Sequence, residues 1–238
     1  MLHTNLSVNE KGHLEFAGVD CLELAKEYKT PLYVIDEQRI REKCRTYVNA
    51  MKEHFGESSF PLYASKALSC KKVYRIVNEE NMAVDVVSGG EAYTAFKAGF
   101  PMERVYFHGN NKTEDEIELA LELGVGFFVA DNIDELELLN EKAKSRNIKQ
   151  KILMRITPGI DTHTYEAVRT GQVDSKFGTP IETGQALELV KKALAFSNLE
   201  LEGFHCHVGS QVFDGVSFCD SADIMIKFIA DVKKETGF

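Results

Sequence analysis

The sequence alternates short apolar runs with longer amphipathic stretches, and this alternation constrains the fold more than any other feature. Each run is short and flanked by turn-forming residues, which is typical of strands buried on both faces. Because helix signals separate the runs, the sequence predicts parallel β-α-β units with right-handed connections. The six runs are residues 61–65, 83–87, 104–107, 126–130, 152–156 and 201–208.

The stretches between the runs carry helix start and stop signals. The spacing of a capping box, in which the first and fourth residues bind each other's backbone, occurs three times: Thr113 with Glu116, Ser88 with Glu91, and Thr179 with Glu182. In the third, Pro180 is expected at the first helical position. Gly124 and Gly99 are expected to end the first two helices.

Six strands in strict alternation with helices suit either a (β/α)₈ barrel or a doubly wound sheet. Polar residues follow nearly every predicted strand, whereas a doubly wound sheet gathers its site at one switch point. We therefore favour an α/β fold of the TIM-barrel type. These polar residues are Lys66, Ser88 to Glu91, His108 to Asn110, Asp131, Arg155 and His207 to Ser210.

Residues 1–35 stand outside the alternation. Residues 14–16 and 31–35 are predicted strands with a helix at 19–29 between them, and a further helix at 37–54 leads into the first barrel strand. We predict two regions, an N-terminal segment at 1–35 and a barrel at 36–238. Only six of eight barrel units are counted, so we expect the barrel to be truncated after the sixth.

Composition excludes several classes of function. The net charge of −9 argues against a nucleic-acid partner, because such binding depends on basic residues that contact phosphates. The five scattered cysteines lack a C-x-x-C pair and are typical of free thiols in a reducing compartment. No apolar run reaches the ~20 residues of a membrane span, and the first residues lack a signal peptide. These features predict a cytoplasmic location.

Lys66 and Asp85 are candidate site residues because of their places at neighbouring strand ends. A lysine in a dry barrel mouth would have a lowered pKa and could condense with an aldehyde, although Lys66 could equally be a solvated surface lysine. A carboxylate within a buried strand is costly unless it meets a cation or a donor. Lys66 is the expected partner of Asp85.

His205 and His207 share one face of the last predicted strand. They could be a metal pair, but few further ligands are expected at the other strand ends. Alternatively, one imidazole could stack on a planar cofactor whose phosphate meets Gly209 and Ser210. The histidines could also be structural. The charged stretch 135–144 is predicted to be a solvated helix face.

Five segments together resemble the diaminopimelate decarboxylases, a family of the fold-type III, alanine-racemase-like enzymes that use pyridoxal 5′-phosphate (PLP). The segments occur in that family's order and spacing over residues 30–215. They are YASKA (63–67), DVVSGGE (85–91), FHGNNK (107–112), TGQVDSKFG (170–178) and GFHCHVGSQ (203–211).

The resemblance implies a role for each matching residue. Lys66 would carry PLP on its amine, His207 would stack on the pyridine ring, and Ser210 with Gly209 would hold the phosphate. Asp85, Glu91 and Arg155 would line the cofactor site, and no metal would be needed. The implied reaction is decarboxylation of meso-diaminopimelate to L-lysine, the last step of lysine biosynthesis.

The family also sets expectations for the whole protein. Its members continue well beyond 238 residues and form homodimers, and residues 1–35 would pack with a C-terminal β-domain. We therefore expect the 238 residues alone to be inactive. Two alternatives stay open: another fold-type III decarboxylase that acts on a polyamine precursor, and a non-catalytic PLP-binding protein.

Overall fold

The computed structural model describes residues 4–160, 177–210, 212 and 215–238. The chain divides into two compact units, one formed by Met1–Pro61 with Glu79–Met82 and the other by Leu62–Asn78 with Ala83–Phe238. The expected boundary after residue 35 thus differs from the division in space, because the helix that follows it belongs to the first unit. The assignment of residues 1–35 to a partner domain stays a prediction.

The first unit contains a small antiparallel sheet and two helices. The sheet has strands β1 (Leu6–Val8), β2 (Leu14–Phe16) and β3 (Val19–Asp20), and the helices are α1 (Cys21–Tyr28) and α2 (Glu37–Phe55). Helix α1 begins two residues later than expected because Asp20 pairs with β2 and caps the helix, accepting from the Leu22 backbone N–H at 2.8 Å. The strand expected at 31–35 is wrong: this segment has no regular structure and pairs with none of the described strands.

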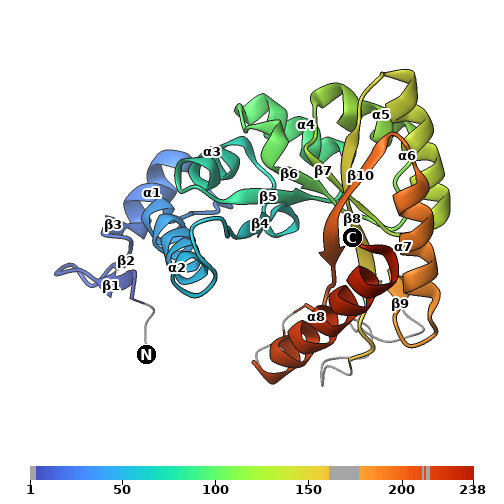
Figure 1. The fold of residues 1–238 in the computed structure, drawn as a ribbon. Coiled ribbons are helices and arrows are strands. Elements are labelled where there is room, and N and C mark those ends of the chain that lie inside the picture. The colour runs from blue at the N-terminus through green and yellow to red at the C-terminus, as the bar shows by residue number, and fades with distance from the viewer. Residues whose placement is uncertain (1–3, 161–176, 211, 213–214) are drawn as a thin grey trace. The chain divides into compact units, whose positions relative to one another are not determined.

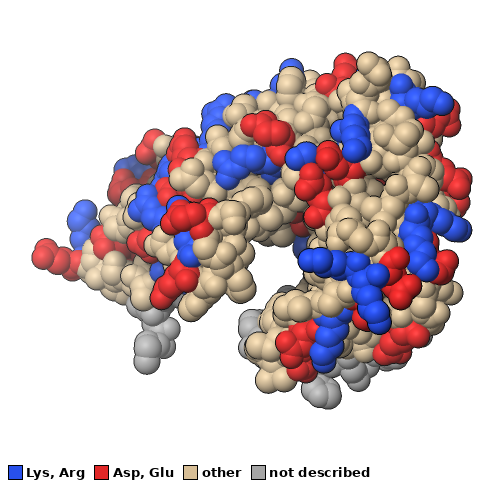
Figure 2. All heavy atoms as spheres, in the orientation of Figure 1, with Lys and Arg blue, Asp and Glu red and all other residues tan. Residues whose placement is uncertain are grey.

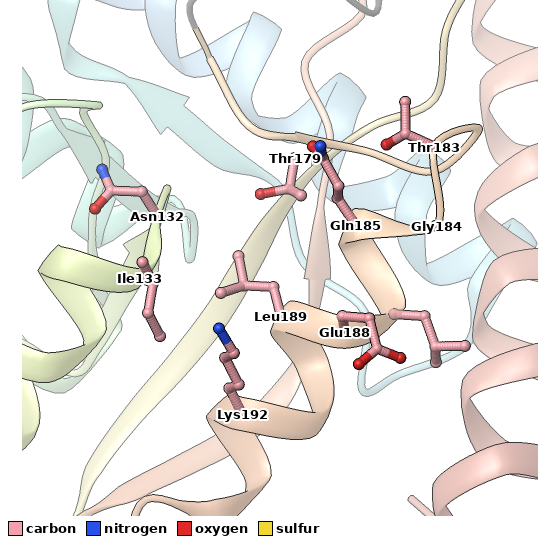
Figure 3. A pocket seen from close by; sticks show the side chains of 10 residues that line it. Asn132, Ile133, Thr179, Thr183, Gly184, Gln185, Glu188, Leu189 and Lys192 are labelled. Atoms are coloured by element: carbon pink, nitrogen blue, oxygen red, sulfur yellow. The ribbon is translucent and has the colours of Figure 1, made fainter.

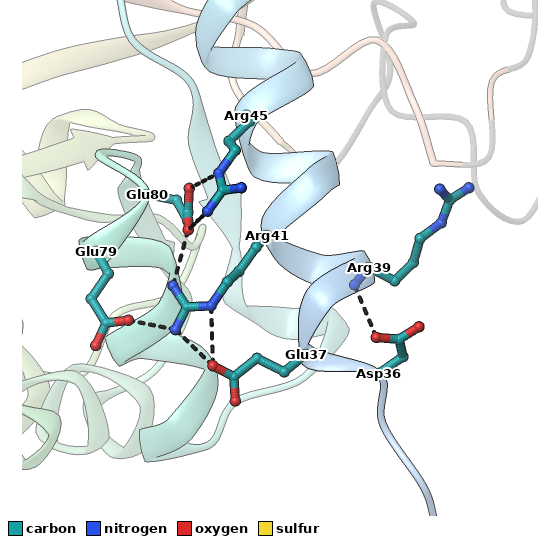
Figure 4. Close-up of polar contacts among 7 residues, drawn as sticks. All are labelled: Asp36, Glu37, Arg39, Arg41, Arg45, Glu79 and Glu80. Atoms are coloured by element: carbon teal, nitrogen blue, oxygen red, sulfur yellow. Dashed lines mark hydrogen bonds and ion pairs between the residues drawn. The ribbon is translucent and has the colours of Figure 1, made fainter. Parts of the chain in front are cut away.

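Two arginines of α2 bind the acidic pair Glu79–Glu80 within the first unit (Figure 4). Arg41 donates to Glu37 at 2.7 Å, to Glu79 at 2.5 Å and to Glu80 at 2.9 Å. Arg45 donates to both carboxylate oxygens of Glu80, at 2.6 and 2.8 Å. The donated hydrogen bonds lower the pKa of Glu80 and keep its carboxylate charged. This network joins α2 to the Glu79–Met82 segment.

The second unit is built on a parallel sheet whose strands follow one another in chain order. Each strand pairs with the next one along the chain, in the order β4-β5-β6-β7-β8-β10, and the short β9 (Thr179–Pro180) pairs with the end of β8. A doubly wound sheet would reverse direction at a switch point, so this succession confirms the barrel-type order. The six strands are β4 (Leu62–Ala64), β5 (Ala83–Val86), β6 (Val105–Phe107), β7 (Phe127–Ala130), β8 (Gln150–Thr157) and β10 (Leu199–His205).

Among the described residues of the second unit, six α-helices accompany these strands, and α4 to α7 lie along one side of the sheet (Figure 1). Alternate strand side chains on that side, such as Val86, Phe128 and Met154, are fully buried. The core therefore lies between the sheet and the helices, which leaves the opposite side chains to face the barrel interior. The helices are α3 (Lys71–Glu79), α4 (Gly89–Ala98), α5 (Glu114–Leu123), α6 (Ile133–Ser145), α7 (Gln185–Ala195) and α8 (Val216–Thr236).

The helix starts bear out one predicted capping box and correct another. Thr113 and Glu116 form the full reciprocal box at the start of α5. The device expected at Thr179 is wrong, because Thr179 and Pro180 pair with β8 instead and α7 begins only after Gly184. Strand pairing thus overrides the local helix signal at this point.

On the face shown in Figure 2, acidic and basic side chains are interspersed, without a large patch of one sign. Among the helices that the structure describes, none is both long enough and apolar enough to cross a lipid bilayer.

Candidate active site

The candidate site lies on the interior side of the parallel sheet, within the second unit. The β8–β10 register places His205 beside Arg155. Asp85 lies on β5, three strands along the sheet from β8. Asp85 and Arg155 alternate with buried residues that face the helices, so their side chains point to the interior side. His108 follows β6, and its Nε2 lies 3.8 Å from Oδ2 of Asp85. The strand ends thus bring these polar groups together.

Asp85 is a carboxyl group with an unusual proton affinity. Burial raises its pKa to about 6, against opposing effects of the Lys66 and Arg155 charges. Its Oδ1 is buried and has no hydrogen-bond partner within the described residues. The charge of Lys66 lowers the pKa of Asp85, and the expected pairing of the two side chains stays a prediction. A buried acceptor of this kind is normally satisfied, so Oδ1 indicates a place for a polar group of a bound molecule.

We predict a measurable pH effect from Asp85 in the cofactor-free full-length protein. Because its pKa rises from 3.8 to about 6 on folding, the folded state binds this proton more tightly. Stability should therefore fall as the pH rises through this window, by up to about 3 kcal/mol at roughly 1.4 kcal/mol per pKa unit. Denaturant unfolding of wild type and Asp85→Asn at several pH values measures it. Parallel pH profiles for the two proteins would contradict the assignment.

Burial keeps three histidines at or after the strand ends neutral. Burial lowers the pKa of His205 to about 3 and that of His207 to about 4, and it also lowers the pKa of His108 well below its usual value. The rings of His108 and His205 meet edge to face, with 4.5 Å between their centroids. Nδ1 of His205 is buried without a hydrogen-bond partner among the described residues. The described residues contain no group of three or more metal-ligating side chains placed to hold a metal ion.

Arg155 is a buried cation held by its surroundings. Its residue is 8% exposed, and its guanidinium lies over the ring of Phe177, 4.3 Å from the centroid. Nε of Arg155 lies 3.8 Å from Oδ1 of Asp131. Burial lowers the pKa of Arg155, although an arginine remains charged in such a site. Arg155 therefore supplies a fixed positive charge at the end of β8.

Lys66 and Glu91 are linked through Ser65. Lys66 lies in the short 3₁₀ turn Ser65–Ala67 that follows β4, and it is exposed, so the expected dry surroundings are absent. The neighbouring Ser65 is fully buried and donates its hydroxyl to Oε2 of Glu91 at 2.7 Å. The same oxygen accepts from the Val87 backbone N–H at 2.7 Å. Glu91 thus ties the turn that carries Lys66 to the start of α4, while Ser88 caps that helix.

The loop after β10 carries the remaining candidate residues. His207, Gly209 and Ser210 follow the strand directly and are partly exposed. Gly209 has a φ of +156°, a backbone conformation that favours glycine. Of the motif at 170–178, residues 170–176 lie outside the described residues, as does Gln211. Phe177 and Gly178 are described and lie against Arg155.

The sequence analysis missed a buried ion pair beside the site. Lys112 and Glu135 meet at 2.7 Å with side chains only 1% and 5% exposed. The expectation of a solvated helix face at 135–144 is therefore wrong at its first residue. Burial lowers the pKa of Lys112, and the Glu135 charge opposes that shift. Asn132 and Glu135 have capping-box spacing at the start of α6, but this spacing predicts a helix start and carries no signal of the ion pair with Lys112.

A separate pocket of about 660 Å³ lies between the first turns of α6 and α7 (Figure 3). None of the predicted site residues lines it. Its lining includes the helix-capping residues Asn132 and Gly184 and the side chains of Thr179, Gln185 and Leu189. The pocket is thus distinct from the polar cluster at the strand ends.

Comparison with known protein families identifies the family of this chain. Residues 37–238 match the family described as pyridoxal-dependent decarboxylase, pyridoxal binding domain. The chain belongs to the pyridoxal-dependent decarboxylases. The resemblance noted in the sequence is confirmed at this level, and so is the expected cofactor of the family, PLP.

Individual pyridoxal-dependent decarboxylases resemble the chain over nearly all its length. It is 48% identical to the diaminopimelate decarboxylase of Bacillus methanolicus and 45% identical to that of Halalkalibacterium halodurans, each over 99% of this chain and 54% of the relative. A solved structure of diaminopimelate decarboxylase from M. jannaschii in complex with L-lysine is 32% identical, with a TM-score of 0.88. It is matched over 99% of this chain and 55% of that one. The chain spans about half the length of the curated relatives it matches.

The residues at the strand ends fit a pyridoxal phosphate. Two buried polar atoms, Oδ1 of Asp85 and Nδ1 of His205, are without a hydrogen-bond partner among the described residues and could be satisfied by a bound polar molecule. Arg155 offers a buried positive charge on β8, and Lys66 is an amine that follows β4, the strand beside the one that carries Asp85. A phosphate, an aromatic ring and an aldehyde need groups of these kinds.

Proposed function

We propose that the full-length protein is a PLP-dependent decarboxylase that converts meso-diaminopimelate to L-lysine. The observation that carries this proposal is the 48% identity, over 99% of the chain, to a protein named diaminopimelate decarboxylase. The likeness to a relative solved with L-lysine supports the same product. The arrangement of Asp85, Arg155 and the strand-end histidines supports a site for a charged, planar cofactor.

The proposed roles are those that the resemblance to the family implies for these side chains. Lys66 would hold the cofactor through its amine, and His207 would lie against the pyridine ring. Gly209 and Ser210 would bind the phosphate through backbone N–H and hydroxyl groups. The remaining residues, Asp85, Glu91 and Arg155, would border the ring. The burial of Asp85 and Arg155 and the charges of the three side chains support these places.

The reaction is balanced without an oxidant or a reductant. The bond between a carboxylate carbon and its α-carbon breaks, CO₂ leaves, and a proton takes its place on the α-carbon. PLP, when bound, supplies a ring that stabilises the electron pair left on that carbon. The protein's own groups orient the substrate and set the local field. With a pKa of about 6, Asp85 is mostly ionised at neutral pH and takes up a proton just below it.

Substrate competition tests this proposal. We expect full-length protein loaded with PLP to release L-lysine and CO₂ from meso-diaminopimelate in equal amounts. Its kcat/KM for ornithine should be lower by roughly 10⁴-fold, because a site built to bind a polar group rejects a substrate that lacks it. Comparable turnover of ornithine or arginine would favour a polyamine-precursor decarboxylase. Bound PLP without turnover of any of these amino acids would favour a non-catalytic role.

We also infer that the full-length protein acts as a homodimer in the cytoplasm. The dimer is inferred from the resemblance to the fold-type III decarboxylases. The cytoplasmic location is supported by the five free cysteines, which suit a reducing compartment. Sedimentation of the full-length protein measures the first inference, and cell fractionation measures the second.

A further inference from the structure

A chain of polar contacts leads from a buried lysine to Arg155, and the roles proposed above do not use it. The three N–H groups of the Lys112 ammonium reach Oε1 of Glu135 at 2.7 Å and the backbone oxygens of Gly109 at 2.9 Å and Val129 at 2.8 Å. Lys112 therefore joins the ends of β6 and β7 to the first turn of α6.

The second oxygen of Glu135 continues the chain toward the site. Its Oε2 accepts from the backbone N–H of Asp131 at 3.1 Å. Oδ1 of Asp131 then accepts from the Gly178 backbone N–H at 3.0 Å and lies 3.8 Å from Nε of Arg155. The Lys112–Glu135 pair thus fixes the backbone of the residue whose side chain faces Arg155.

Burial sets this arrangement apart from a surface ion pair. Asp131 has a side chain that is 7% exposed, and the figure for Arg155 is 10%. Moving such charges out of water is costly, and only close geometry and full hydrogen bonding compensate. Here both partners of the Lys112–Glu135 pair have their hydrogen bonds satisfied, so the pair is a rigid support.

The segment of Phe177 and Gly178 constrains Arg155 as well. The ring of Phe177 lies under its guanidinium, and the Phe177 carbonyl accepts from the Thr157 hydroxyl at 2.8 Å. Gly178 has a φ of +72°, and a Cβ there would lie 2.7 Å from Thr157 Oγ1 and 3.3 Å from Arg155 Cγ. Any larger residue would therefore displace its surroundings. Asp131 holds this closely packed segment through the Gly178 N–H.

We propose that Asp131 is a positioning residue that sets the orientation of the Arg155 guanidinium, and that the Lys112–Glu135 ion pair holds Asp131 in place. This inference rests on the proposed function in one respect, namely that Arg155 borders the bound cofactor. Asp131 itself would not touch the cofactor or the substrate. Its effect on either should pass through Arg155.

A double-mutant cycle tests the inference in the full-length protein. The variants are Asp131→Asn, Arg155→Met and the double variant, and the measurements are the Kd of PLP from absorbance titration of cofactor-free protein and kcat/KM. Asparagine keeps an oxygen for the Gly178 N–H but removes the charge that faces Arg155. We expect Asp131→Asn to weaken PLP binding and lower kcat/KM by about tenfold, within the range of coupled neighbours. In the Arg155→Met background it should have no further effect.

The controls separate failure of the inference from failure of the proposed function. Asp134→Asn, which removes an exposed carboxylate in the first turn of α6, should leave the Kd of PLP unchanged. Additive losses in the double variant would overturn the inference and leave the proposed function standing. If Arg155→Met alone changed neither measurement, the proposed role of Arg155 would be wrong and the inference with it. Asp131→Ser serves as the second variant if Asp131→Asn does not fold, with the same expected outcomes.

Discussion

Replacing Lys66 by alanine is expected to lower kcat/KM of the full-length protein by on the order of 10³-fold or more. A single preorganised group in an active site contributes ~10²–10³ in rate, and Lys66 would in addition hold the cofactor covalently. The variant should also lose the visible absorbance of lysine-bound PLP. Steady-state kinetics and an absorbance spectrum at saturating PLP measure both effects.

Chemical reduction locates the modified lysine independently of activity. Borohydride treatment of the PLP-loaded protein should leave a pyridoxyl group on Lys66, identified by peptide mass. Lys71 is a matched control, since it is an exposed lysine at the start of α3, and Lys71→Ala should retain activity and absorbance. Label on another lysine, or normal turnover by Lys66→Ala, would overturn the assignment.

The strands of the second unit could be predicted because their signal is local. A strand buried on both faces is mostly apolar, so the segments at 83–87 and 126–130 stand out without knowledge of their neighbours. Strand order could be inferred only indirectly, from the polar residues after each strand. Where pairing decides the structure, local signals failed: Pro180 pairs with β8 although its context favours a helix, and residues 31–35 find no partner among the described strands.

Part of the candidate site was also predictable, because its signals are local in the sequence. Asp85 stands out as a carboxylate within an apolar run, and His205 with His207 by their spacing on one strand. The pair of Lys112 and Glu135 could not be found this way, because its members are 23 residues apart in stretches rich in charge. Only the fold shows that β6, β7 and α6 bring the two side chains together in a buried place.

Removing the charge of Lys112 is expected to destabilise the full-length protein strongly. In Lys112→Met, the Glu135 carboxylate would remain buried without a cation, and the oxygens of Gly109 and Val129 would lose their donor. Breaking a buried pair in this way typically costs about 3–5 kcal/mol. For a domain of this size, each kcal/mol lowers Tm by roughly 2–4 °C. Denaturant unfolding at neutral pH, with a thermal melt, measures the loss.

Two further variants show whether the loss comes from the buried charge. Lys142 is a matched control, because it binds Glu118 at 2.6 Å and also Glu114 near the surface of α5 and α6, where water can replace the lost contacts. Lys142→Met should therefore cost much less than Lys112→Met. The double variant Lys112→Met/Glu135→Leu removes both charges, and it should be more stable than the sum of the two single losses predicts. Equal losses of stability in Lys112→Met and Lys142→Met would show that Lys112 is no more important to folding than a surface lysine. The inference that the Lys112–Glu135 pair holds Asp131 in place would then be wrong.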